Sequence, residues 1–119
     1  MQHWNATLAI TRIRGVLVVT LPPDLAQHGL DALRQAVLER IAEERIRAVV
    51  LDFSAVDVIS AEEFRRVRGF LQAIRLMGAD VAIVSLSAGV VLYLTEIQAD
   101  TAGLRFFFGL DEALQHFSQ

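Results

Sequence analysis

The sequence predicts an α/β fold in which helices link successive strands of one mixed sheet. The apolar run Ala48–Phe53, rich in β-branched residues, lies between two segments with helical spacing, and a second such run, Val81–Leu86, follows the second of them. Strands that alternate with helices in this way are typical of helix-covered sheets. The predicted order is β β α β α β α β α, and 119 residues fit a single domain, 1–119.

The first two strands are predicted at the start of the chain. Residues 8–14 mix apolar and polar side chains, from Leu8 and Ile10 to Arg12 and Arg14, the chain turns at Gly15, and an apolar run continues from Val16 to Leu21. This pattern favours a hairpin. Pro22 and Pro23 lack backbone donors and therefore end the second strand.

Two amphipathic helices are predicted on either side of Ala48–Phe53. In the segments Leu30–Glu44 and Ala61–Met77, apolar residues recur at intervals of three and four, which places them on one buried stripe. The second segment also carries a basic ridge on another stripe, formed by Arg65, Arg68 and Arg75.

The last third of the chain is predicted to contain two helices and a strand. Ser87 can cap a helix over Ala88–Ile97 that has almost no polar side, so this helix lies either deep in the domain or against a neighbour. A strand follows in "LRFFF", where Phe107 must face opposite to its two neighbours, and a short helix spans Leu110–Phe117. With 54% hydrophobic residues in so short a chain, we expect a homo- or hetero-oligomer.

Composition excludes several classes of partner. Eleven basic and fourteen acidic residues give a net charge of −3 without a dense basic cluster, so nucleic acid is not expected as a partner. No apolar stretch approaches the roughly 20 residues of a membrane span, so no membrane insertion is expected. Cysteine is absent and the first residues lack the pattern of a signal peptide, which predicts a cytoplasmic protein.

The sequence offers little support for catalysis. His3, His28 and His116 are far apart and show no metal or triad spacing, and no glycine motif for nucleotides is present. Asp52 and Asp57 flank a strand-to-helix connection and could serve acid/base chemistry, but loop carboxylates that accept from backbone amides are the favoured interpretation. We therefore expect no enzyme and no catalytic, cofactor-binding or metal-binding residues.

The stretch "DVISAEEF" contains a helix start. Ser60 and Glu63 have the S-x-x-E spacing of a capping box, in which each side chain accepts from the backbone N–H of the other residue. Glu62 adds negative charge at the positive end of the helix dipole and is four residues from Arg66. On these grounds alone Ser60 is a structural residue.

The ordered series "VVLDFSAVDVIS", "LMGADVAIVSL", "TEI" and "LDEAL" resembles the STAS domains of bacterial anti-sigma-factor antagonists, most of all the stand-alone scaffold subunit of the stressosome. The resemblance runs from about residue 8 to residue 117. It implies a mixed sheet and a non-enzymatic function in partner switching. The domain would bind a switch protein kinase or an anti-sigma factor when unphosphorylated, release it on phosphorylation at the start of the second helix, and have STAS-domain paralogues as further partners.

The chain departs from the family pattern at the switch site. Ser60 occupies the position of the usual Asp, and Ala61 occupies that of the phospho-acceptor. Three interpretations follow, in this order: a permanently unmodified site, Ser60 as a displaced acceptor, or standing negative charge from Glu62 and its neighbour. The expected partner-binding residues are Asp57, Ser60, Ala61 and Glu62, with Arg65 and Arg68 on the neighbouring exposed ridge.

An alternative interpretation of another class remains open. The apolar segment Ala88–Ile97 and the three consecutive phenylalanines also fit a purely structural STAS subunit of a homo- or hetero-oligomeric complex, with no phosphorylation switch. A small enzyme that uses Asp52 and Asp57 is the third and weakest possibility.

Overall fold

The computed structural model describes residues 9–25 and 27–118, and its elements follow the predicted order along the chain. Two positions named above, Leu8 and His3, lie outside the described residues. The elements are β1 (Ile10–Ile13), β2 (Val16–Thr20), α1 (Gln27–Glu43), β3 (Ala48–Asp52), α2 (Ala61–Leu76), β4 (Asp80–Val84), α3 (Ala88–Glu96), β5 (Phe106–Phe107) and α4 (Leu110–Phe117).

One five-stranded sheet forms the centre of the fold, with the strand order β1-β2-β3-β4-β5. β1 and β2 form an antiparallel hairpin in which Ile13 pairs with Val16 across a two-residue turn. β2 to β5 are parallel to one another. The predicted mixed sheet and its hairpin are confirmed, and the carboxyl ends of the parallel strands meet at one end of the sheet.

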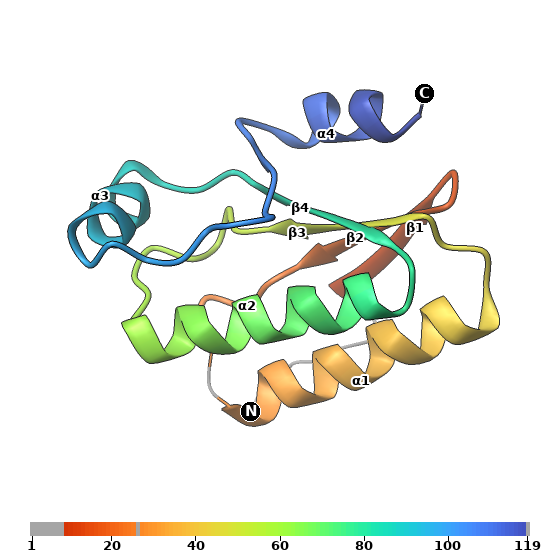
Figure 1. Cartoon of the computed structure of the whole chain (residues 1–119), viewed down its shortest axis with the longest axis horizontal. Coiled ribbons are helices and arrows are strands. Elements are labelled where there is room, and N and C mark those ends of the chain that lie inside the picture. The colour runs from red at the N-terminus through yellow and green to blue at the C-terminus, as the bar shows by residue number, and fades with distance from the viewer. Residues whose placement is uncertain (1–8, 26, 119) are drawn as a thin grey trace.

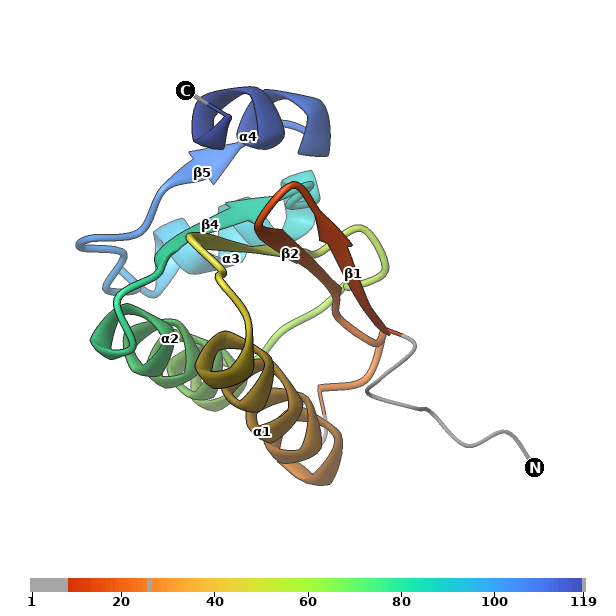
Figure 2. The same ribbon diagram turned by 90° about the vertical axis from the view of Figure 1, so that its right-hand side faces the viewer.

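Helices lie on both faces of this sheet (Figure 1). α1 and α2 cover one face, α4 covers the other, and α3 lies beyond the carboxyl ends of the parallel strands, as Figure 2 also shows. Residues 48–51 of β3 are completely buried, as expected for a central strand covered on both faces. The larger part of the core lies between the sheet and α1 and α2, and a smaller part lies under α4, around Ala113 and Phe117.

The boundaries of several elements differ from the prediction by a few residues. α1 starts at Gln27 rather than Leu30, and β4 covers Asp80–Val84 rather than Val81–Leu86. β4 ends early because Ser85 adopts a positive φ of 63°, which turns the chain out of the sheet before α3. Apolar periodicity marks the buried part of an element and not the backbone turn that ends it.

The apolar third helix is neither wholly buried nor wholly exposed. Val90 and Leu94 are buried, whereas Val91 is 44% exposed and Leu92 is 63% exposed. The following strand alternates as predicted: Phe107 packs against the core under α4, while its neighbours Phe106 and Phe108 are exposed. Large apolar side chains of α3 and of the β5 region therefore remain exposed.

An ion-pair cluster joins β1 to the end of α1. Glu44 accepts from Arg12 at 2.7 Å and also pairs with Arg40 one helical turn earlier. These two guanidinium groups hold the pKa of the Glu44 carboxyl below its usual range, and the hydrogen bond from Arg40 has the largest effect.

Within residues 9–25 and 27–118, no helix is long and apolar enough to cross a membrane.

Candidate functional site: the loop between β3 and α2

The loop between β3 and α2 alternates between buried anchors and exposed side chains. Phe53, Val56 and Ile59 are buried in the core, and the backbone N–H of Val56 donates to the carbonyl of Phe53 at 2.9 Å. Asp57 and Val58 between these anchors face solvent. The loop is therefore held at several points while it presents a carboxylate and an apolar side chain outward.

The two aspartates of the sequence prediction have different surroundings. The Asp52 carboxylate accepts from the backbone N–H of Ser54 at 2.9 Å, which is the loop-carboxylate interpretation favoured from the sequence. Asp57 is exposed and forms no ion pair with any described residue. The described residues also contain no group of three His, Cys, Asp or Glu side chains that could hold a metal ion.

The capping box at the start of α2 is confirmed. The Ser60 Oγ accepts from the backbone N–H of Glu63 at 3.0 Å, and the Glu63 carboxylate accepts from the backbone N–H of Ser60 at 2.8 Å. Ser60 has the extended backbone of an N-cap, with φ −90° and ψ 164°. The hydroxyl of Ser60 thus faces solvent and is at the same time engaged as the helix cap.

Two further residues of the predicted switch site open the helix. Ala61 is the first helical residue and is half-buried, and its methyl group offers no hydroxyl. The Glu62 carboxylate pairs with Arg66 at 3.2 Å, as its four-residue spacing predicts, but 71% of its side chain is exposed. Asp57, Ser60 and Glu62 are therefore exposed where the loop passes into α2, and Ala61 between them is half-buried.

A groove of about 660 Å³ runs beside this surface. Four segments line it: the β2–α1 connection, the β3–α2 loop, the first turn of α2 and the first turns of α3. The lining carries three carboxylates, those of Asp24, Asp57 and Glu63, and no arginine; its apolar part includes Ile59 and Tyr93. Because the lining carries one sign of charge, a positively charged group is its complement.

The sequence did not single out Asp24, Val58 or Tyr93 as parts of this site. Asp24 follows two prolines and indicated only the end of a strand, and Tyr93 lies in a helix whose buried face was unknown. The order of the strands could have predicted the participation of Asp24, because connections that follow the carboxyl ends of neighbouring parallel strands lie close together. The exposure of Val58 could not be predicted, because an apolar residue close to Val56 and Ile59 is expected to be buried with them.

The prediction of an exposed basic ridge is wrong for Arg68. Arg65 is exposed, but the Arg68 side chain is only 25% exposed and its guanidinium pairs with Asp100 at 2.8 Å. Arg75, further along the same stripe, donates to the carbonyl of Gly103 at 3.4 Å. Arg68 and Arg75 thus contact the α3–β5 connection, and neither Arg65 nor Arg68 lines the groove.

A family model with the description "STAS domain" matches residues 7–99, most of the chain. The chain belongs to the STAS domain family. The resemblance to this family inferred from the sequence is thereby confirmed. No curated protein matches the sequence closely enough to count as a relative.

Several solved structures have the same fold. A variant of RsbS from Moorella thermoacetica superposes with a TM-score of 0.78 at 19% identity, covering 93% of this chain and 99% of that one. A chain from a structure described as the molecular architecture of the stressosome gives 0.78 at 20% identity, with 92% and 95% covered. The anti-sigma factor antagonist SpoIIAA in its unphosphorylated form gives 0.67 at 13% identity, with 92% and 94% covered.

Proposed function

We propose that this STAS domain is a non-enzymatic protein-binding module of a partner-switching pathway, an anti-sigma-factor antagonist or a stressosome-type scaffold. It binds a switch protein kinase or an anti-sigma factor through the β3–α2 loop and the start of α2. One observation carries the proposal: Val58 is 80% exposed next to Asp57, on a loop whose flanking residues are buried. An apolar centre on a fixed support with a charged rim is how protein interfaces obtain both affinity and specificity.

The negative charge of this surface favours a partner with a basic surface. Asp24 and Asp57 are exposed carboxylates that form no ion pair with a described residue, and Glu62 is mostly exposed. A partner that places an apolar socket over Val58 and basic side chains around it would complement both features.

The state of the phosphorylation site follows from two adjacent residues. Ala61 cannot accept phosphate, so we rank a permanently unmodified, binding-competent site first. Ser60 is the second choice, because it is exposed although its Oγ caps α2. A phosphate on Ser60 would add about −1.5 to −2 charge beside Glu63, whose carboxylate already accepts from the Ser60 N–H, and would oppose this reciprocal cap. The third choice is standing negative charge from Glu62 and Glu63.

Affinity capture tests the class of function. The wild-type chain serves as bait in a lysate of its source organism, beside Asp57→Arg and the matched control Asp80→Arg. Asp80 is also an exposed aspartate, but it begins β4 at the opposite end of the sheet. We expect an ATP-binding kinase-like protein or an anti-sigma factor with the wild type and the control, and none with Asp57→Arg. Capture that is equal for all three baits would contradict the proposed surface.

A kinase assay with phosphate mapping by mass spectrometry tests the switch site. We expect the captured kinase to leave the wild type unmodified and to phosphorylate Ala61→Ser, which restores a hydroxyl at the family's acceptor position. A phosphate on Ser60 of the wild type would overturn this ranking in favour of the displaced acceptor.

The alternative, a purely structural STAS subunit, is supported by the apolar surface beyond the sheet. Leu92 in α3 is 63% exposed, and Phe108, directly after β5, is 91% exposed. Burial of such side chains against another subunit would lower the free energy of assembly. Light scattering of the wild type and Leu92→Glu distinguishes the two: an oligomer that dissociates in the variant, with no kinase captured, favours the structural subunit.

A further inference from the structure

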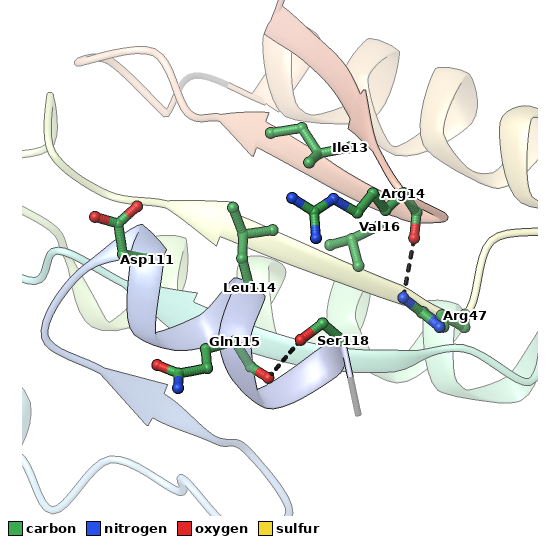
Figure 3. A pocket seen from close by; sticks show the side chains of 8 residues that line it. All are labelled: Ile13, Arg14, Val16, Arg47, Asp111, Leu114, Gln115 and Ser118. Carbon is green, nitrogen blue, oxygen red and sulfur yellow. Dashed lines mark hydrogen bonds between the residues drawn. The ribbon is translucent and has the colours of Figure 1, made fainter.

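A second groove lies at the opposite end of the sheet from the switch site, between the β1–β2 turn and α4 (Figure 3). Its volume is about 330 Å³, near the lower limit of small-molecule sites. The lining residues are Ile13, Arg14, Val16, Arg47, Asp111, Leu114, Gln115 and Ser118.

Two arginines stand on the hairpin side of this groove. The tripeptide Arg-Ile-Arg occurs twice, at residues 12–14 and 45–47, and the sheet places the two copies next to each other. The second arginine of each copy, Arg14 and Arg47, lines the groove. Both side chains are exposed, and neither forms an ion pair with a described residue, whereas Arg12 of the first copy pairs with Glu44.

Hydrogen bonds fix the Arg47 side chain against the backbone of the turn that carries Arg14. The backbone N–H of Arg47 donates to the carbonyl of Gly15 at 2.9 Å, and its Nη2 donates to the carbonyl of Arg14 at 3.1 Å (Figure 3). The turn and the start of β3 are thereby tied together. The Arg47 guanidinium is thereby partly pre-organised for a ligand that it would share with the exposed Arg14 guanidinium.

The backbone conformation of Arg14 independently indicates that its side chain has a function. Arg14 has a φ of 51° and Gly15 a φ of 80°, so both central residues of the hairpin turn have positive φ. Asn, Asp and Gly are the residues favoured at the first of these positions, and an arginine there costs stability. Strained backbone positions of this kind cluster at functional sites, where the function of the side chain explains why an unfavourable residue type is present.

We propose that this groove binds a small organic phosphate, with the phosphate group between the guanidinium groups of Arg14 and Arg47. Planar guanidinium groups donate paired hydrogen bonds to phosphate oxygens. Ile13, Val16 and Leu114 provide an apolar wall for the body of the ligand. The Asp111 carboxylate and the Gln115 amide line the α4 side, where they can hydrogen-bond to hydroxyl groups of the ligand and where a second negative charge would be repelled.

NMR titration of the ¹⁵N-labelled chain tests the site, with glycerol 3-phosphate as the probe, inorganic phosphate as the minimal ligand and glycerol as the uncharged control. We expect saturable shifts confined to amides of the β1–β2 turn, residues 45–47 and α4. The affinity should be in the millimolar range or tighter, with no response to glycerol. Shifts that do not saturate, or that spread evenly over all exposed arginines, would overturn the proposal.

The variant Arg14→Asn separates binding from folding. Asn tolerates positive φ and favours this turn, so the variant should be at least as stable as the wild type, yet bind glycerol 3-phosphate about tenfold or more weakly. Arg34→Ala removes an exposed arginine on α1 and is the matched control with unchanged affinity. Asp111→Asn should bind inorganic phosphate more tightly than the wild type, because one repelling charge is gone. Retained binding in Arg14→Asn, or equal losses in Arg14→Asn and Arg34→Ala, would contradict the site.

Discussion

Replacement of Ser60 by Ala tests whether the hydroxyl at the proposed switch site stabilises the fold. The change removes the acceptor of the 3.0 Å bond from the Glu63 N–H and leaves this donor without its partner in the first turn of α2. The reciprocal bond from the Ser60 N–H to the Glu63 carboxylate also loses its support. N-cap replacements of this kind cost about 1 kcal/mol, so we expect a loss of about 1 kcal/mol in the free energy of unfolding.

Urea unfolding followed by far-ultraviolet circular dichroism measures this loss. With a denaturant dependence of about 1–3 kcal/mol per molar, a loss of about 1 kcal/mol lowers the midpoint by roughly 0.5 M. Ser60→Asp keeps a side-chain acceptor and should remain close to the wild type. Ser54→Ala is the matched control, because Ser54 is an exposed serine of the same loop that uses its backbone N–H rather than its hydroxyl.

Two results would refute this reasoning. The first is a Ser60→Ala variant as stable as Ser54→Ala, because the cap would then contribute nothing. The second is an equal loss in Ser60→Asp and Ser60→Ala, because the loss could then not come from the missing acceptor.

Three further predictions concern other parts of the molecule. Phe117→Ala should cost about 3–5 kcal/mol, because Phe117 is 7% exposed and fills the small core under α4; a loss under about 1 kcal/mol in urea unfolding would mean that α4 is not docked there. A double-mutant cycle of Arg68→Ala and Asp100→Ala should give a coupling of about 0.5 kcal/mol that falls at about 1 M salt, and a coupling unchanged by salt would contradict an ion pair at this surface. Ionised Glu44 stabilises the fold, because the pKa of its carboxyl is lower in the folded chain than the ordinary value of 4.5. The wild type should therefore have a higher free energy of unfolding than Glu44→Gln near neutral pH, and this difference should disappear as the pH falls from 4.5 through the lowered pKa. A difference that does not depend on pH would contradict this role of Glu44.

The sequence was sufficient for the architecture because the fold depends on patterns that a single chain displays. Residues 48–51 are apolar without interruption and prove to be the fully buried centre of the sheet. The stripe of α2 that contains Phe64, Val67 and Leu71 is buried as its spacing predicts. The capping box was visible in full, since both of its partners lie within four consecutive residues.

The candidate site was only partly predictable, because it combines residues that are distant in the chain. Asp24 and Tyr93 join Asp57 in the groove, although 33 and 36 residues separate them from it. The partner of Arg68, Asp100, comes from a loop 32 residues further on, so the helical stripe alone could not show that this arginine is paired. Periodicity says which face of a helix is polar, but not whether that face meets solvent or another loop.

The direct test of the proposed function is the affinity of the captured partner for two charge-reversed variants, measured by isothermal titration calorimetry. Asp57→Arg reverses a charge on the β3–α2 loop, and Asp80→Arg makes the same change at the other end of the sheet. We expect Asp57→Arg to weaken binding at least tenfold, because like charges then face each other across the interface, and Asp80→Arg to bind like the wild type. Equal affinities of the wild type and Asp57→Arg would contradict the binding surface proposed for this STAS domain.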